Sequence, residues 1–330
     1  MSIGGLTQAE LAKLAQEQVN EDPDRIADDI QMVKEWLEKQ PHLQNICKGK
    51  YSKSKIFIAS FQKDYYLDDQ WIQFFLRGCK YSLERTKEKL DFFNSVRSAL
   101  PDWFGQWDQN IDSVLDIVKA GGFILLNGYD KKGRRVFVFN LQDIDPVKFS
   151  NTYDLINIFY LMILEILMDS LDQCSVTGLV SGFMIEGITM AQVALYSNPV
   201  TVKKSAKVIQ DAYPFRPQAM HMLNLPPLAE TAVTLFKSCL SEKMKSRIKV
   251  GVLANFMEDT GAEILPEELG GTNGKLQDHV EYTCRMISDK RDWLKLRTEL
   301  KSDEAKRVGQ AKDYNEIFGM EGSFRKLNLD

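Results

Sequence analysis

The sequence lacks the short motifs by which many enzyme and metal sites are recognised. Its 330 residues contain no Gly-x-Gly-x-x-Gly run and no His-Glu-x-x-His pair. Residues 270–275 have three residues between the outer glycines, where a phosphate-binding loop needs four. The serine in residues 178–182 is out of register for a nucleophile elbow, and the three histidines are not spaced as metal ligands. We therefore expect no catalytic residue, no metal ion and no cofactor, and we interpret the protein as a non-enzyme.

Signals for secretion, membrane insertion and disulfide bonding are also missing. The first residues show no basic segment followed by an apolar one, and Ser2 stands where N-myristoylation requires glycine. The most apolar run, residues 155–168, is too short for a membrane span and contains Glu165. A net charge of −4 argues against bulk nucleic-acid binding. The cysteines are odd in number and scattered, which is typical of buried thiols in a reducing compartment: Cys47, Cys79, Cys174, Cys239 and Cys284. We expect a cytoplasmic protein.

Helical periodicity dominates the first third of the chain. Apolar residues recur at helical spacing from Ile26 to Leu37. Two more helices are predicted around the aromatic residues 71–75 and across residues 83–96. The chain is longer than a typical single domain, so we expect more than one module. The first module is predicted to be an N-terminal helical bundle over residues 1–107.

Strands and helices alternate after residue 107. Short apolar runs bounded by turn residues predict strands, and longer periodic runs between them predict helices. The predicted strands are residues 123–129, 136–140, 177–185, 219–225 and 247–253, and the predicted helices are residues 153–171, 189–196 and 199–212. This order predicts an α/β domain with a mixed sheet over residues 108–280. A charged helical extension and tail follow over residues 281–330.

The segment 211–249 combines an apolar helix with a basic end. After two adjacent prolines, apolar residues from Leu228 to Phe236 fall on one helical face, and we expect this helix to continue to Arg247. Over residues 237–249, five Lys or Arg are opposed by a single Glu, which is more than the capping of a helix end needs. The apolar stripe is compatible with ordinary packing on a sheet. The charge pattern favours a movable lid beside an anionic surface.

Several runs of residues resemble the CRAL-TRIO lipid-transfer family. Residues 68–90 (DDQWIQFFLRGCKYSLERTKEKL) are similar to its N-terminal helical signature. The runs that follow its core domain in order are 210–216 (QDAYPFR), 224–226 (NLP), 236–237 (FK), 240–243 (LSEK) and 265–271 (LPEELGG). Within the family, the chain most resembles the branch of the α-tocopherol transfer protein and the cellular retinaldehyde-binding protein. Residues 318–327 resemble the ending of insect members of this branch.

The resemblance implies a pocket for one hydrophobic molecule, closed by the lid helix. It also implies that the lid opens at membranes containing phosphatidylinositol bisphosphate. By the matching pattern, the head-group contacts are Arg216, Lys243 and Arg247, and we add Lys245 from the same basic run. Each Lys or Arg near an anionic bilayer contributes about 1 kcal/mol, so a group of them supports reversible docking. Gln218 occupies a further position that is basic in the family, so that contact is lost here.

The wall of the pocket is expected along one strand, its neighbouring helices and the lid. Alternation places Leu179, Ser181 and Phe183 on one face of a strand, and the resemblance turns that face toward the ligand. The expected pocket residues are Tyr160, Ile163, Leu164, Leu179, Ser181, Phe183, Val208, Ile209, Met220, Ala229, Ala232, Val233, Leu235 and Phe236. Such a pocket binds mainly by apolar burial, with one or two polar groups setting orientation. Ser181 is the expected polar contact, and ordinary core packing is the alternative for each of these residues.

The sequence therefore predicts a monomeric carrier of a hydrophobic small molecule, a tocopherol, a retinoid or another lipid. We expect it to bind anionic, phosphoinositide-containing membranes peripherally and to transfer its ligand between them. The alternative is a phosphoinositide-responsive membrane adaptor, or a phospholipid exchange protein, whose pocket ligand acts as a regulator. In that case the charged residues 281–307 are the candidate surface for a protein partner.

Overall fold

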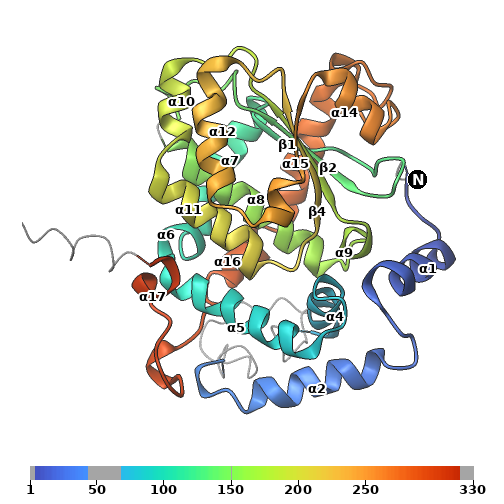
Figure 1. The fold of residues 1–330 in the computed structure, drawn as a ribbon, viewed down its shortest axis with the longest axis vertical. Coiled ribbons are helices and arrows are strands. Elements are labelled where there is room, and N and C mark those ends of the chain that lie inside the picture. The colour runs from blue at the N-terminus through green and yellow to red at the C-terminus, as the bar shows by residue number, and fades with distance from the viewer. Residues whose placement is uncertain (1–3, 44–67, 150, 320–330) are drawn as a thin grey trace, which may run out of the picture.

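The computed structural model describes residues 4–43, 68–149 and 151–319, and its helices surround one five-stranded sheet (Figure 1). The strands lie in chain order across the sheet: β1 (Phe123–Leu125), β2 (Arg135–Asn140), β3 (Leu179–Met184), β4 (Pro217–Leu223) and β5 (Ile248–Gly251). β1 is antiparallel to β2, and the remaining neighbours are parallel. The predicted α/β fold with a mixed sheet is confirmed.

Helical crossovers join the parallel strands, as parallel pairing requires. Between β2 and β3 lie α8 (Thr152–Asp169) and α9 (Cys174–Thr177). Between β3 and β4 lie α10 (Met190–Tyr196), α11 (Pro199–Lys207) and the π-helical turn η2 (Val208–Ala212). Between β4 and β5 lie η3 (Pro227–Ala229), α12 (Glu230–Ser238) and α13 (Glu242–Lys245). Figure 1 shows α10, α11 and α12 on one side of the sheet and α14 (Leu253–Thr260) on the other.

The lid segment consists of two helices. The expectation of one helix running to Arg247 is wrong, because α12 ends at Ser238 and α13 begins at Glu242. Ser241, between them, has an extended backbone (φ −64°, ψ 155°), and its carbonyl accepts the amides of Met244 and Lys245 to start the new turn. The predicted basic end of the lid therefore lies on a separate element. No helix in the described ranges is both long and apolar enough to cross a membrane.

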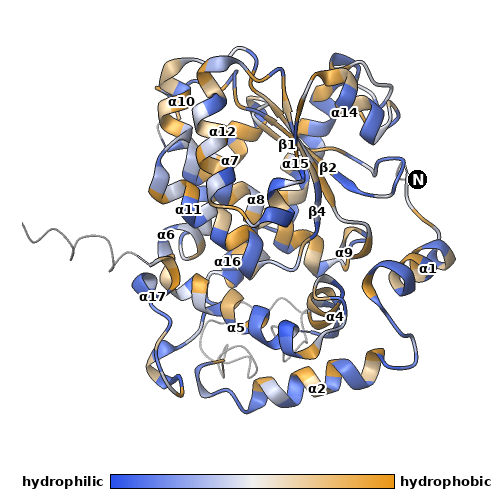
Figure 2. Cartoon of the chain, viewed as in Figure 1, coloured by the Kyte–Doolittle hydropathy of each residue, from blue (hydrophilic) through white to orange (hydrophobic). Residues whose placement is uncertain are grey.

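The N-terminal part of the chain forms α1 (Gln8–Val19), α2 (Ile26–Glu38), η1 (Pro41–Leu43), α4 (Asp69–Gly78), α5 (Leu83–Ala99), α6 (Pro101–Phe104) and α7 (Trp107–Lys119). In Figure 1, α2, α4 and α5 lie below the sheet, whereas α7 lies at the level of the strands. Along α2, orange apolar residues alternate with blue polar ones in Figure 2, as the helical spacing predicts. Trp71, Phe75 and Phe93 form an aromatic cluster at the centre of this group.

The C-terminal extension returns to the N-terminal helices. Its elements are α15 (Leu276–Asp289), α16 (Arg291–Arg297), η5 (Glu304–Lys306) and α17 (Tyr314–Phe318). Asp91 on α5 pairs with Arg307 at 2.9 Å and with Lys312 at 2.6 Å, and the Asp303 amide donates to the His42 carbonyl at 2.8 Å. The extension thus straps both ends of the described chain together. Most of the insect-like ending, from residue 320, lies outside the described residues.

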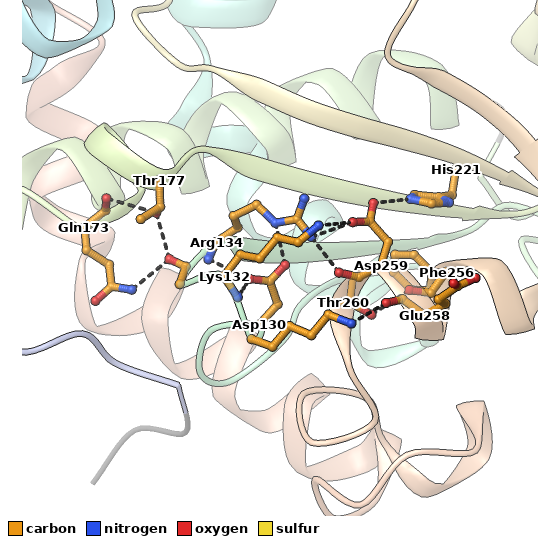
Figure 3. Close-up of polar contacts among 12 residues, drawn as sticks. Asp130, Lys132, Arg134, Gln173, Thr177, His221, Phe256, Glu258, Asp259 and Thr260 are labelled. Carbon is orange, nitrogen blue, oxygen red and sulfur yellow. Dashed lines mark hydrogen bonds and ion pairs between the residues drawn. The ribbon is translucent and has the colours of Figure 1, made fainter. Parts of the chain in front are cut away.

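A polar cluster fixes α14 to the sheet. Asp259 on α14 accepts from Lys132 at 2.8 Å, His221 at 2.9 Å and Arg134 at 3.1 Å, and Figure 3 shows these groups directed at its carboxylate. Lys249 adds a further ion pair at 2.9 Å. Burial opposes ionisation of Asp259, but the hydrogen bonds from Lys132, Lys249 and His221 hold its pKa far below the usual value. His221 thus contacts α14, on the side of the sheet opposite to α10, α11 and α12.

A buried carboxylate, Glu165 on α8, joins four parts of the chain. It is fully inaccessible and accepts from Tyr213 Oη at 2.8 Å, from Arg297 Nε at 2.8 Å and from Arg97 Nη1. The Arg297 guanidinium also lies 3.9 Å from the centre of the Trp71 ring. Burial, followed by the negative charge of Glu165, raises the pKa of Tyr213. The residue that argued against a membrane span is therefore the joint between α5, α8, α16 and the approach to β4.

We expect Glu165→Gln to lower the free energy of unfolding by about 3–5 kcal/mol, because it leaves two buried guanidinium groups without a counter-charge. Chemical denaturation followed by circular dichroism measures this change. Glu84→Gln is the control, since the Glu84 carboxylate is 81% exposed and its pair with Lys87 lies on the surface, where such pairs contribute about 0.2–1 kcal/mol. Equal effects of the two changes would show that Glu165 is not a structural joint.

Candidate functional site: an apolar cavity and a basic cluster

An apolar cavity of about 170 Å³ lies between the sheet and helices α8, α10, α11 and α12. This space is many times larger than one water molecule needs. Among the described residues, none of those that line the cavity has a charged side chain. A cavity of this size with apolar walls is suited to a hydrophobic ligand, because a dry apolar space gives water few hydrogen-bond partners.

The structure brings many of the expected pocket residues together in this cavity. On the strands they are separated by two positions, and on the helices by three or four, so each element presents one face. The expected residues in the lining are Tyr160, Ser181, Phe183, Ile209, Met220, Ala229, Ala232, Val233 and Phe236.

Five expected residues lie outside the lining. Ile163 and Leu164 lie on the same face of α8 as Tyr160, one turn closer to its C-terminal end. At that point they pack in the main core and not against the cavity. Leu179 has the strand parity of Ser181, yet it lies at the first residue of β3, in that same core.

The other two are off the lining stripes of their helices. On α11 and η2 the stripe is Val202, Ser205, Ala206 and Ile209, whereas Val208 belongs to the main core. On the lid the stripe is Ala229, Ala232, Val233 and Phe236, so Leu235 is turned away from the cavity.

Sequence reasoning missed much of the wall. The missing members are Phe139, Leu141, Tyr153, Ile156, Asn157, Ile185, Ile188, Val193, Tyr196, Val202, Ser205, Ala206, Pro217, Met222, Leu240 and Met244. Helical spacing carries a signal for some of them, because Tyr153, Ile156 and Asn157 precede Tyr160 by seven, four and three positions. No local pattern marks the members contributed by α10 and by the ends of β2 and β3.

The polar groups of the cavity are neutral. Asn157 donates to the Tyr153 carbonyl at 2.7 Å, and Ser205 donates to the Thr201 carbonyl at 2.9 Å. Burial raises the pKa of Tyr160, so its phenol stays protonated. Within the described part of the chain, the hydroxyl groups of Tyr160 and Ser181 have no protein hydrogen-bond partner. These two groups are available to a ligand.

Helix α12 covers the cavity as a thin wall. None of its residues is buried, although Val233 and Phe236 pack on the cavity side. A helix that rests on a cavity makes few close contacts and lies at the low-stability end of a fold. Asn224, ahead of this helix, has a positive φ of 50°, which residues other than glycine seldom adopt. Its side-chain amide donates to the Glu186 carboxylate at 2.9 Å and holds this conformation. The segment has the properties of a lid with a defined start.

Five basic side chains from three regions form a cluster beside the lid's C-terminal end, hereafter the basic cluster: Lys80, Arg85, Arg216, Lys243 and Arg247. Burial, followed by the positive charges of the other four, lowers the pKa of Lys243. Burial and the nearby Arg247 also lower the pKa of Arg216. No member forms an ion pair with a carboxylate in the described residues. Arg216 and Arg247 donate to the backbone carbonyls of Val176 and Pro217. The cluster is therefore a positive surface without a paired carboxylate, which suits a polyanion.

The basic cluster differs in membership from the expected head-group contacts. Arg216, Lys243 and Arg247 belong to it, whereas Lys245 pairs with Glu242 at 2.6 Å. Lys80 and Arg85, which sequence reasoning did not select, come from α5 and the turn before it. They lie more than 130 positions from Arg216 along the chain, so only the folded structure brings them together.

Comparison with known proteins assigns two domains. Residues 119–271 match the CRAL/TRIO domain, and residues 64–114 match the Pinta-like UBA domain. The first match contains all five strands, α8 to α14 and the cavity. The second contains α4, α5 and α6, which supply Lys80 and Arg85.

Curated relatives match over most of the chain. The human alpha-tocopherol transfer protein-like protein is 24% identical over 289 residues, which cover 87% of this chain and 77% of the relative. Human clavesin-2 is 25% identical over 282 residues, covering 81% and 75%. The crystal structure of Sfh5 superposes with a TM-score of 0.47 at 14% identity, covering 80% of this chain and 97% of that one. The resemblance noted in the sequence is confirmed at the level of the domain: residues 119–271 carry a CRAL/TRIO domain.

Proposed function

We propose that the protein carries one neutral hydrophobic molecule between membranes. The observation that carries this proposal is the cavity, which is apolar, free of charged side chains among the described residues, and covered by a loosely packed lid. The CRAL/TRIO domain and the name of the alpha-tocopherol transfer protein-like relative support the same role. No step of this cycle requires a catalytic residue, a metal ion or a cofactor.

The chemistry of the wall selects the class of ligand. Burying a carboxylate or phosphate beside groups that do not neutralise it costs several kcal/mol. The only polar side-chain groups in the described lining are hydroxyl and amide groups, among them the hydroxyl groups of Ser181 and Tyr160. These groups favour a lipid with one hydroxyl or carbonyl group, such as a tocopherol or a retinoid. The same wall argues against the phospholipid-exchange alternative, because a phosphate head would have no counter-charge inside.

The basic cluster supports docking on anionic membranes. Its five cations sit at the C-terminal end of the lid, so a membrane bound there lies next to the segment that must move. Each contributes about 1 kcal/mol near an anionic bilayer, which suits reversible, peripheral attachment from the cytoplasm by a monomer. A phosphoinositide head group, with several phosphates in a small space, fits the convergence of side chains from three regions.

We expect Ser181→Arg to abolish binding of retinol, a neutral and fluorescent probe, with a loss of at least about 100-fold in affinity, because it places an unpaired charge in the apolar cavity. Retinol fluorescence titration measures the loss. Ser238→Arg introduces the same side chain on the exposed side of the lid and should bind retinol normally. Retained binding by a folded Ser181→Arg protein would show that the ligand lies elsewhere.

We expect the double change Lys243→Ala and Arg247→Ala to slow retinol transfer to phosphatidylcholine vesicles containing phosphatidylinositol bisphosphate by about 30-fold, the effect of losing two basic contacts. Retinol affinity should not change, because neither side chain lines the cavity. Lys80→Ala with Arg85→Ala should have an effect in the same direction. Lys249→Ala is the control, since Lys249 is already paired with Asp259. Undiminished transfer by both double variants would exclude the cluster from docking.

A further inference from the structure

The side chain of Gln210, in the π-helical turn η2, holds the C-terminal end of the lid. Its Nε2 donates to the carbonyl of Cys239 at 3.2 Å, and its Oε1 accepts from the amide of Ser241 at 2.9 Å. Cys239 and Ser241 are the first and last residues of the break between α12 and α13. A third bond, from Nε2 to the Ala206 carbonyl at 3.1 Å, fixes the orientation of the amide. One side chain thus satisfies backbone groups that the broken helix leaves free.

Lys89 on α5 anchors the turn that carries Gln210. Its ammonium donates to the carbonyls of Gln210 at 2.9 Å, Asp211 at 3.0 Å and Tyr213 at 3.2 Å. These are the carbonyls that a helix leaves without partners where it ends, and a cation there also complements the helix dipole. Burial lowers the pKa of Lys89. The N-terminal helical region therefore fixes η2 through three hydrogen bonds from one half-buried side chain.

The elements that carry Gln210 and Lys89, η2 and α5, also contribute residues to the cavity and to the basic cluster. Ile209, next to Gln210, lines the cavity. Arg85, a member of the basic cluster, precedes Lys89 by one turn of α5, and Lys243 follows Ser241 by two residues. An anion bound between Arg85 and Lys243 therefore acts on both chain segments that Gln210 and Lys89 hold together.

We propose that Gln210 is a positioning residue that latches the lid, and that Lys89 ties this latch to the N-terminal helices. The proposal rests on the proposed function, in which α12 must move for the ligand to leave. The latch keeps the cavity closed away from membranes, because opening requires the bonds to Cys239 and Ser241 to break. Binding of a polyanion to the basic cluster acts on the chain directly after Ser241, so the latch is released where the membrane is bound.

The test compares Gln210→Leu, Gln210→Glu and Lys89→Met with the unaltered protein. Gln210→Leu removes both bonds to the lid and should raise amide hydrogen exchange in residues 230–241 and retinol release to pure phosphatidylcholine vesicles by about tenfold each. Gln210→Glu keeps the acceptor for Ser241 but loses the donor to Cys239, so a smaller rise is expected. Lys89→Met should act in the same direction. Lys87→Met, on the same helix and with an exposed partner, is the control and should change neither rate.

The two measurements separate the latch from the carrier function. A rise confined to residues 230–241, with an unchanged thermal midpoint, supports a latch, because a general loss of stability would raise exchange throughout the core. Unchanged exchange and release in Gln210→Leu would overturn the proposal. If the unaltered protein does not bind retinol or a tocopherol, the proposed function fails, while amide exchange still decides whether Gln210 holds the lid.

Discussion

The buried charge of Glu165 is the constraint on which the arrangement of this protein depends. A carboxylate keeps its charge in a protein interior only if cations and hydrogen-bond donors surround it. Here the donors come from α5, from α16 and from Tyr213 ahead of β4. Because Tyr213 directly follows η2, the same cluster holds the turn that carries Gln210. The N-terminal helices, the sheet and the C-terminal extension form one frame, and the proposed lid, α12, rests on it without a buried residue of its own.

The molecule is divided into a tightly packed part and a hollow part, and α8 runs through both. Toward its C-terminal end, Ile163, Leu164 and Glu165 lie in the continuous core. Toward its start, Tyr153 and Tyr160 face the cavity. The fold thus combines a large, closely packed core with a cavity that is covered by a helix without buried residues.

Periodicity in the sequence predicted which face of a strand or helix meets the cavity, but not how far along each element the cavity extends. The alternation of Ser181 and Phe183 and the stripe from Ala229 to Phe236 identified the faces that meet the cavity. It did not show where along α8 the cavity stops, because Ile163 and Leu164 lie on the same face of the helix as Tyr160. Lys80 and Arg85 were missed because their role depends on contacts with residues far along the chain. The break in the lid was missed because Gln210, outside the lid, provides the partners that make it possible.

The strap formed by the C-terminal extension has a consequence for the order of folding during synthesis. Asp91 lies beside His42, and both precede the CRAL/TRIO domain in the chain, while the cationic partners of Asp91, Arg307 and Lys312, follow that domain. Ser302 and Asp303 likewise provide amides for the carbonyls of Asn94 and His42. These contacts of the N-terminal helices therefore cannot form until the whole CRAL/TRIO domain has been translated. A nascent chain stalled before residue 307 lacks both cationic partners of Asp91.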